Sequence, residues 1–170
     1  MERTNHIRLF EAADVSAIID IYNPLIKDCP FLYESNQRTA ADQLQRFQNL
    51  QNQGYPVWVL EQESTKKVMG FAYLSPFRPQ SGYAMTAEHS IYLHTDFQGQ
   101  GLGRLLYNHL EANARDLNIK NLIGVIDSKH ITSLQFHQKM GFQKVGEIPN
   151  VALKHGQLLT VEYWLKSIVV

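Results

Sequence analysis

Three glycines lie within five residues of one another at Gly99, Gly101 and Gly103, in the run Gln98-Gly-Gln-Gly-Leu-Gly103. Glycine lacks a Cβ atom, so a ligand can approach the main-chain N–H groups of such a run closely. A helical pattern begins at Leu102, which places the positive end of a helix behind these amides, and such ends bind phosphate oxygens. The run therefore predicts a pyrophosphate site, although a tight turn without a ligand also explains the glycines.

The glycine spacing excludes two common phosphate loops. It does not follow the pattern Gly-x-Gly-x-x-Gly with an acidic ribose ligand about twenty residues later, which is typical of NAD sites. No Gly-Lys-Ser/Thr follows the run, as it does in nucleoside triphosphate loops. Neither NAD nor ATP is expected here.

The elements before the loop are predicted from hydrophobic periodicity. We expect a strand over 7–10, a helix over 15–27 capped by Asp14, a helix that Thr39 caps and that ends before Gly54, and an antiparallel hairpin of strands 57–61 and 68–74. The segment 75–82 contains Pro76, Pro79 and Gly82, which is typical of a binding loop.

The elements around the loop are a strand over 84–94, a helix over 102–117 and an apolar strand over 122–126. This order predicts a parallel crossover. Alternation in the first strand places two sets of side chains on opposite faces: Glu88, Ser90, Tyr92 and His94 on one, His89, Ile91 and Leu93 on the other. A helix over 132–140 with Gly141 at its C-cap, and strands over 142–148 and 158–165, complete a mixed α/β fold. Its central sheet is mostly antiparallel, with one parallel crossover and four flanking helices.

Length and charge limit the function further. The 170 residues predict a single domain over 1–170. Lys plus Arg and Asp plus Glu are equal at 16 each, so we expect no nucleic-acid or membrane partner. Cys29 is the single cysteine, the run Met1–His6 lacks the apolar character of a secretion signal, and no stretch approaches the length of a membrane span. A cytoplasmic location is therefore expected.

Several motifs resemble a known family. Gln98, Gly101 and Gly103 match Arg/Gln-x-x-Gly-x-Gly/Ala, the acyl-CoA signature of the GNAT N-acetyltransferases, and the element order from about Ile7 to Lys166 is similar to theirs. Within that superfamily the chain resembles the phosphinothricin and methionine sulfoximine acetyltransferases, which acetylate the α-amino group of small amino-acid analogues. The motifs that carry this resemblance are Thr86-Ala-Glu88-His-Ser-Ile-Tyr92, Leu134-Gln-Phe-His137-Gln-Lys-Met-Gly141-Phe142 and Lys154-His155-Gly156.

The resemblance implies the GNAT fold, acetyl-CoA as co-substrate, a small-molecule amine substrate, no metal and a homodimer. It also implies that main-chain groups of Ile91 to Leu93 pair with the pantetheine arm like an added strand, while Gly99 to Arg104 hold the pyrophosphate. The expected cofactor residues are Ile91, Tyr92, Leu93, Gln98, Gly99, Gln100, Gly101, Leu102, Gly103, Arg104 and His130. His130 replaces the family's usual Asn, and its imidazole can still donate a hydrogen bond.

Acetyl transfer to an amine needs a neutral nucleophile, a stabilised oxyanion and a proton for the departing thiolate. Glu88 is the expected general base, and the alternative is a carboxylate on an exposed strand face. For the thiolate we expect His137 or Tyr107, with core packing as the alternative for both. The resemblance assigns the oxyanion to main-chain amides near Ile91 to Leu93. Cys29 is expected to be a packed residue, so transfer is direct in a ternary complex.

Recognition of an amino-acid acceptor needs a cation for its carboxylate, which Arg78 supplies in this interpretation. Phe77 and Tyr83 are expected to wall the acceptor side chain beside Glu88, and a solvent-facing Arg78 is the alternative. Two other functions stay open. One is a GNAT enzyme with another amine acceptor: a protein N-terminus, a ribosomal protein, a polyamine or an aminoglycoside. The other is a sensor that binds acetyl-CoA without catalysis.

Overall fold

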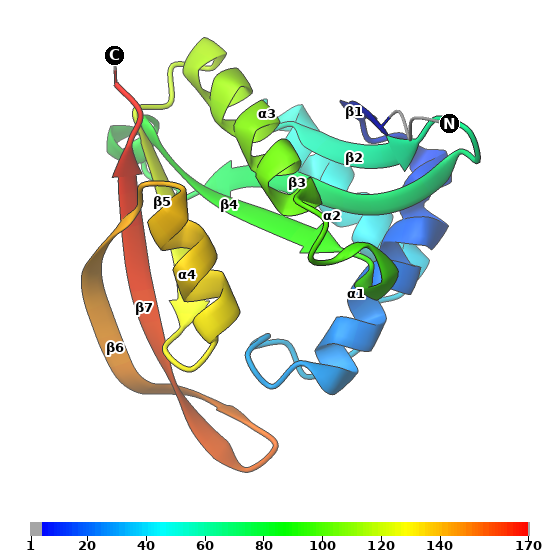
Figure 1. Ribbon diagram of the computed structural model, residues 1–170. Coiled ribbons are helices and arrows are strands. Elements are labelled where there is room, and N and C mark those ends of the chain that lie inside the picture. Colours follow the sequence, from blue (N-terminus) through cyan, green and yellow to red (C-terminus); the bar gives the residue numbers. More distant parts are fainter. Residues whose placement is uncertain (1–4, 170) are drawn as a thin grey trace.

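A computed structural model describes residues 5–169, so Met1–Thr4 and Val170, including most of the N-terminal run considered above, lie outside the described part. Four helices and seven strands occupy this part (Figure 1). In chain order they are β1 (Asn5–Leu9), α1 (Val15–Asp28), α2 (Ala40–Asn52), β2 (Val57–Gln62), β3 (Lys67–Pro76), β4 (Thr86–Leu93), α3 (Leu102–Asp116), β5 (Asn121–Asp127), α4 (Ile131–Lys139), β6 (Gln143–Lys154) and β7 (Gln157–Ser167).

The strands form one sheet in the order β1-β2-β3-β4-β5-β7-β6. All neighbouring strands are antiparallel except β4 and β5, which are parallel and are joined by the crossover through α3. The expected mixed α/β fold, with a mostly antiparallel sheet, one parallel crossover and four helices, is confirmed.

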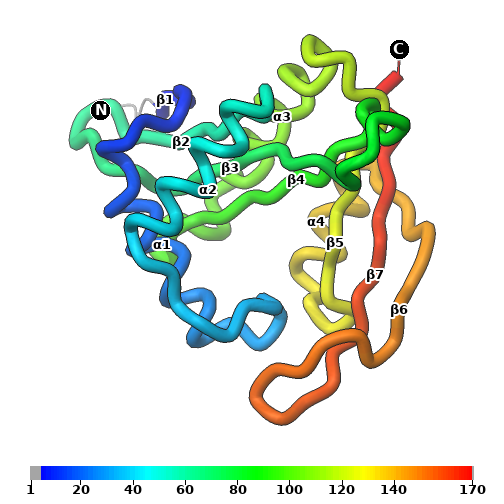
Figure 2. Tube along the Cα trace, turned by 180° about the vertical axis from the view of Figure 1, so that it is seen from behind, coloured from blue at the N-terminus to red at the C-terminus, as the bar shows by residue number. Residues whose placement is uncertain are grey.

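Helices cover both faces of the sheet, and each covered face has its own core. On one face α3 packs on β3 and β4, with Leu106, Leu110 and Ala114 buried, while α4 lies against β5. On the other face α1 and α2 pack on β2 and β3 through Ile18, Phe47 and their neighbours (Figure 2). The helical periodicity that predicted these elements therefore corresponds to the side chains that they bury.

Both predicted N-cap residues occupy the N-cap position of their helix, but only the Thr39 side chain makes a capping hydrogen bond. The Thr39 hydroxyl accepts a hydrogen bond from the Asp42 N–H at 3.1 Å. Asp14 precedes α1, but its side chain does not cap that helix. Its two carboxylate oxygens each accept a hydrogen bond from the Arg8 guanidinium at 2.8 Å, and Oδ2 also accepts one from the Glu11 N–H. A bidentate pair with arginine outweighs a single cap bond, so Asp14 ties β1 to the start of α1.

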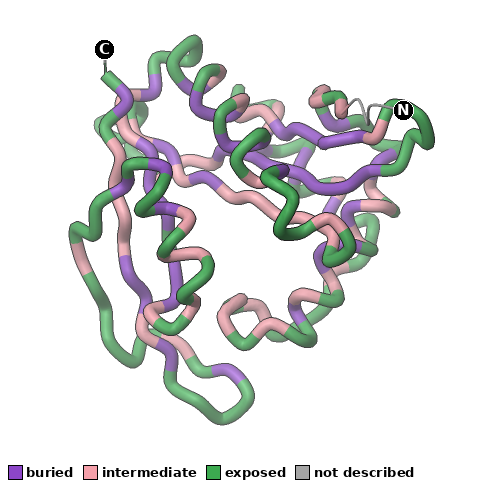
Figure 3. Tube along the Cα trace, in the orientation of Figure 1, coloured by how far each residue is buried: buried purple, intermediate pink, exposed green. Residues whose placement is uncertain are grey.

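The C-terminal hairpin is longer than expected. The sequence predicted strands over 142–148 and 158–165, whereas β6 and β7 extend to a turn at His155 and Gly156. The pairing shifts register between Ile148 and Ala152, where Asn150 has a φ of 54°. A bulge of this kind breaks the alternation of side chains without ending the strand. Figure 3 shows β6 exposed along most of its length, in contrast to the buried β2 and β3.

Smaller differences concern element ends. His94 lies beyond β4, at the start of a short 3-10 turn, so it does not share the strand face of Glu88. Gly141 follows the C-cap residue Met140 and adopts a φ of 89°. Within 5–169 no helix combines the length and apolar character needed to cross a membrane.

Candidate functional site

The parallel pair at the centre of the sheet separates soon after it begins. β4 and β5 are paired only from Thr86–Asn121 to Glu88–Ile123, after which the two strands diverge (Figures 1 and 2). On its other side β4 stays paired with β3 as far as Leu93. From His89 onward, the edge of β4 that faces β5 therefore has no strand partner within the described residues. This is where the sequence placed the main-chain groups of Ile91 to Leu93.

The glycine loop lies beyond the free end of β4, at the N-terminus of α3. Gly99 and Gly101 have φ values of 73° and 79°, in the left-handed region that favours glycine, and Gly101 is the N-cap of the helix. A Cβ atom at either position would meet nothing within 4 Å, so the main chain is open on this side. The first N–H groups of a helix have no intrahelical acceptor. Within the described residues the N–H groups from Gly99 to Gly103 donate to no main-chain carbonyl, whereas that of Arg104 donates to Gly101, so the loop offers donors and a helix dipole to an anion.

Two glutamines hold this loop by bonding to its own main chain. The Gln98 amide donates to the Leu93 carbonyl at 3.4 Å, and the Gln100 amide donates to the Asp96 carbonyl at 3.0 Å. Arg104 lies exposed on the first turn of α3. Gln98 thus connects the loop to the end of β4, which keeps the two proposed cofactor segments together.

Glu88 marks the point at which β4 and β5 part, and the predicted acceptor residues gather around it. Its Oε1 lies 4.0 Å from an Arg78 guanidinium nitrogen. The Arg78 guanidinium stacks on the Phe77 ring, 4.2 Å from its centroid, and Tyr83 packs edge-on against Phe77 at 5.8 Å. Burial raises the pKa of the Glu88 carboxyl above its ordinary value, although the positive charge of Arg78 opposes this shift.

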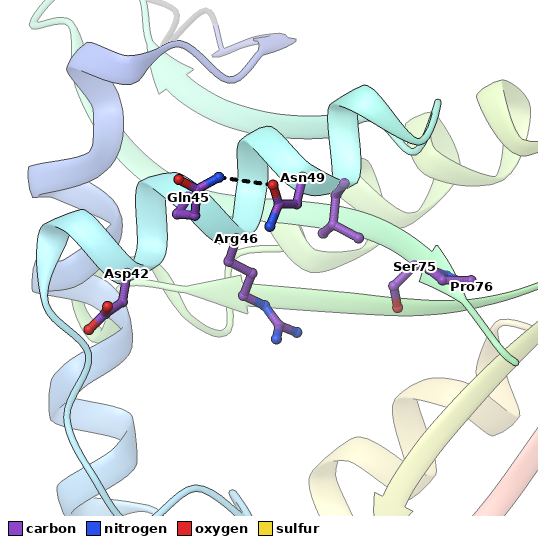
Figure 4. Close-up of a pocket in the computed structure, with 7 residues that line it drawn as sticks. Asp42, Gln45, Arg46, Asn49, Ser75 and Pro76 are labelled. Carbon is purple, nitrogen blue, oxygen red and sulfur yellow. Dashed lines mark hydrogen bonds between the residues drawn. The ribbon is translucent and has the colours of Figure 1, made fainter. Parts of the chain in front are cut away.

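A shallow cavity of about 520 Å³ opens nearby, between α2 and the end of β3 (Figure 4). It is lined by Ser75, the register partner of Glu88, and by Arg46, whose guanidinium nitrogen lies 3.5 Å from the Tyr73 hydroxyl. Arg46 is therefore a second cation on the Glu88 face. The sequence analysis missed it because a single arginine on the polar side of a helix carries no distinguishing pattern.

On the opposite face of β4, His89 and His137 are buried against each other. Their Nε2 atoms are 3.0 Å apart, and His137 Nδ1 lies 2.7 Å from the Ser133 carbonyl, so Nδ1 of His137 carries a proton and donates it there. His89 must then donate through Nε2 to the lone pair of His137. Burial and His137 lower the pKa of His89 to about 3, and burial also lowers the pKa of His137. Both rings are neutral at neutral pH.

Gly124 on β5 makes room for this imidazole pair. A Cβ atom there would lie 2.8 Å from both Cδ2 and Nε2 of His137. Tyr107 packs beside His89, with ring centroids 5.8 Å apart. Its hydroxyl is buried without a hydrogen-bond partner among the described residues, and burial together with Glu111 raises the pKa of the phenol. His137 and Tyr107 therefore belong to one buried cluster, on the side of β4 away from Glu88.

Comparison with known proteins identifies the family. The model of the Acetyltransferase (GNAT) family matches residues 19–142, which is more than half of the chain and includes the glycine loop and both histidines of the buried pair. The chain belongs to the GNAT acetyltransferase family. It is therefore an acyltransferase, and the strands that separate at Glu88 are the centre of a GNAT fold.

Several relatives of this GNAT chain are named for amino acids or amino-acid analogues. It is 34% identical to the L-amino acid N-acyltransferase MnaT of Escherichia coli over 92% of this chain and 90% of that protein. It is 31% identical to the L-methionine sulfoximine/L-methionine sulfone acetyltransferase of Salmonella typhimurium, over 92% and 91%. The structure of a phosphinothricin acetyltransferase from Sinorhizobium meliloti in complex with AcCoA superposes with a TM-score of 0.91 at 30% identity, covering 96% of this chain and 88% of that one.

His130 lies at the start of the fourth helix, as expected. It occupies the N-cap of α4, where its side chain makes no capping hydrogen bond, and its ring stacks on Phe31 with centroids 5.0 Å apart. Burial lowers its pKa. The hydrogen bond from His130 to the cofactor stays a prediction.

Cys29 lies at the C-terminus of α1, where its N–H donates to the Leu25 carbonyl.

Gly124→Ala tests the packing of the imidazole pair. The added methyl overlaps the His137 ring, so we expect a loss of about 1–3 kcal/mol in the free energy of unfolding, measured by urea denaturation. In a His137→Ala background the overlap is gone and the same change costs far less.

Gly146→Ala is the matched control, since a Cβ atom there meets nothing within 4 Å and the residue also lies in a strand. Unchanged stability of Gly124→Ala would contradict the packing described here.

Proposed function

We propose that this GNAT enzyme transfers the acetyl group of acetyl-CoA directly to the α-amino group of a small amino acid or amino-acid analogue, in a ternary complex. The observation that carries the proposal is the half-buried Glu88 beside Arg78, at the point where β4 and β5 separate. A base and a cation 4.0 Å apart suit a substrate that carries its amine and its carboxylate on one carbon. The names of the relatives support the same acceptor class.

The cofactor is proposed to bind along the free edge of β4. Main-chain groups of Ile91 to Leu93 are unpaired toward β5 and can bond to the amides of a pantetheine arm, as an added strand would. The amides from Gly99 to Arg104 suit the pyrophosphate, because the loop is open and lies at a helix N-terminus. The residues present therefore fit acetyl-CoA, which supplies the activated acyl group. Main-chain N–H groups of the same edge are the proposed oxyanion donors.

Glu88 is the proposed general base. Its raised pKa makes the carboxylate a stronger base. It can then accept a proton from the ammonium group of the acceptor, either directly or through one water. Arg78 binds the acceptor carboxylate, while Phe77 and Tyr83 wall the acceptor side chain. The neutral amine then attacks the thioester carbonyl from the Glu88 face of β4.

His137 and Tyr107, the two residues expected to protonate the departing thiolate, lie on the opposite face of β4. Tyr107 retains its phenolic proton at neutral pH. His137 carries its proton on Nδ1, where it is engaged in a hydrogen bond to the Ser133 carbonyl. A thiol with a pKa of about 8.5 leaves readily at neutral pH. We therefore propose that neither residue is an obligatory donor.

A thiol-release assay with an acceptor panel tests the function. We expect CoA release with amino acids, methionine sulfoximine or phosphinothricin, and much less with spermidine or with the decarboxylated amine of the best acceptor. Arg78→Ala should raise the KM of the amino acid about tenfold or more and leave that of the decarboxylated amine unchanged, because only the former has a carboxylate to bind. A failure to release CoA with any acceptor of the panel would indicate a sensor, and a preference for polyamines would contradict the acceptor class.

Glu88→Gln tests the base. For the wild type, kcat/KM should fall as the pH decreases through the raised pKa of Glu88, because the protonated carboxyl cannot accept a proton. The variant should lose this acidic limb and about 100-fold or more in kcat.

Glu147→Gln on the exposed strand β6 is the control and should keep the wild-type profile. An acidic limb that persists in Glu88→Gln would assign the base elsewhere.

The homodimer also stays a proposal, and the C-terminal hairpin is the proposed interface. β6 is an edge strand with four exposed apolar side chains, namely Val145, Ile148, Val151 and Leu153. Leu158 on β7, the register partner of Leu153, is exposed as well. Light scattering should give a dimer mass for the wild type and a monomer mass for Leu153→Glu/Leu158→Glu. Leu117→Glu, exposed at the end of α3, should remain dimeric.

The cytoplasmic location inferred from the sequence stays a prediction.

A further inference from the structure

The segment between α1 and α2 extends as a loop from the N-terminal half of the sheet toward the C-terminal half and returns (Figures 1 and 2). We name residues 29–36 the crossing segment. The Tyr33 hydroxyl donates to Asp127 Oδ2, at the end of β5, at 2.8 Å. The Phe31 ring stacks on His130 at the start of α4. A third contact comes from Lys154, the last residue of β6, which reaches both this segment and the end of α1.

Lys154 is a buried cation whose hydrogen bonds go to main-chain carbonyls. It is only 5% exposed, and its ammonium donates to the Ile26 carbonyl at 2.8 Å and to the Leu32 carbonyl. Among the described residues no carboxylate lies within ion-pair distance of it. A buried charge without a counterion is costly unless its donors are satisfied. The two carbonyls must therefore compensate for the lost hydration.

The Ile26 carbonyl is a favourable acceptor for a cation. It lies in the last turn of α1, where helix carbonyls lack intrahelical donors and the dipole is negative. Lys154 thus acts as a C-terminal cap supplied from 128 residues away along the chain. The bond to Leu32 extends the same anchor into the crossing segment.

The crossing segment lies on the acceptor side of the sheet. Glu88 is the register partner of Ile123, and alternation along β5 places Ile123 and Asp127 on the same face. They are four residue steps apart along the strand, which corresponds to about 13 Å. The Tyr33–Asp127 contact therefore lies on the same face of the sheet as Glu88, farther along β5.

We propose that Lys154 is a positioning residue for the acceptor site. Its ammonium fixes the crossing segment, and the crossing segment is the wall of the acceptor site opposite Glu88. Lys154 does not touch the reacting atoms, and acetyl-CoA binding is independent of it. The effect of Lys154 on the KM of the acceptor rests on the proposed function, whereas the anchoring of the crossing segment does not.

Lys154→Met removes the donors and keeps the length of the side chain. We expect the KM of the amino-acid acceptor to rise about tenfold or more, since bonds from a charged donor are lost, while the KM of acetyl-CoA stays unchanged. Hydrogen exchange of amides in 29–36 should accelerate, and that of β3 and α3 should not. Lys154→Arg keeps donors and should restore part of the acceptor affinity.

Lys144→Met is the matched control, because Lys144 lies on the same strand but is exposed and bonds to Glu147 and Glu162. It should change neither KM nor the exchange of 29–36. Faster exchange in Lys154→Met with an unchanged acceptor KM would overturn the wall role, and unchanged exchange would overturn the anchor.

Tyr33→Phe serves if Lys154→Met does not fold. It removes only the hydroxyl that bonds to Asp127 and should raise the acceptor KM alone; an unchanged value would overturn the proposal. If the wild type acetylates no amino acid, the proposed function fails. The exchange measurement needs no acceptor and still decides whether Lys154 holds the segment.

Discussion

The site depends on two parallel strands that stop pairing after three residues. Main-chain N–H and C=O groups inside a protein need partners, and an edge left open at the middle of a sheet would ordinarily be closed by the neighbouring strand. Here β5 turns away after Ile123, and the imidazoles of His89 and His137 pack over Gly124 next to this point. The open edge is therefore an unsatisfied part of the fold, which an amide-containing cofactor can complete.

The alternation of side chains along β4 separates the chemistry into two compartments. Glu88 faces the helices α1 and α2, with Arg78 beside it, whereas His89 faces α3 and α4. Neighbouring residues of one strand thus face the proposed acceptor site on one side and a buried core on the other. This arrangement leaves the proposed base half-exposed, while burial disfavours the charged forms of the histidine pair.

The local patterns of the sequence were sufficient for the elements, the crossover, the loop and the grouping of Phe77, Arg78, Tyr83 and Glu88. They failed where the controlling contact is distant in the chain. Asp14 has the signature of a cap, yet Arg8 on β1 takes both of its oxygens. The partner of His137 is 48 residues away in the chain. The sequence motif that contains Lys154 likewise does not indicate its hydrogen bond to the Ile26 carbonyl. Periodicity carries no information about such pairings, and the bulge at Asn150 removed even the strand signal.

The strand order also determines when the enzyme can become complete during synthesis. β7 lies between β5 and β6, so β6 has no strand to join and β5 remains an edge until β7 has left the ribosome. The N-terminal half, with its own core of α1, α2, β2 and β3, can fold before then. Contacts of such long sequence separation form late because loop closure must precede them. A nascent chain would therefore form the proposed cofactor edge of β4 before it forms the proposed acceptor site.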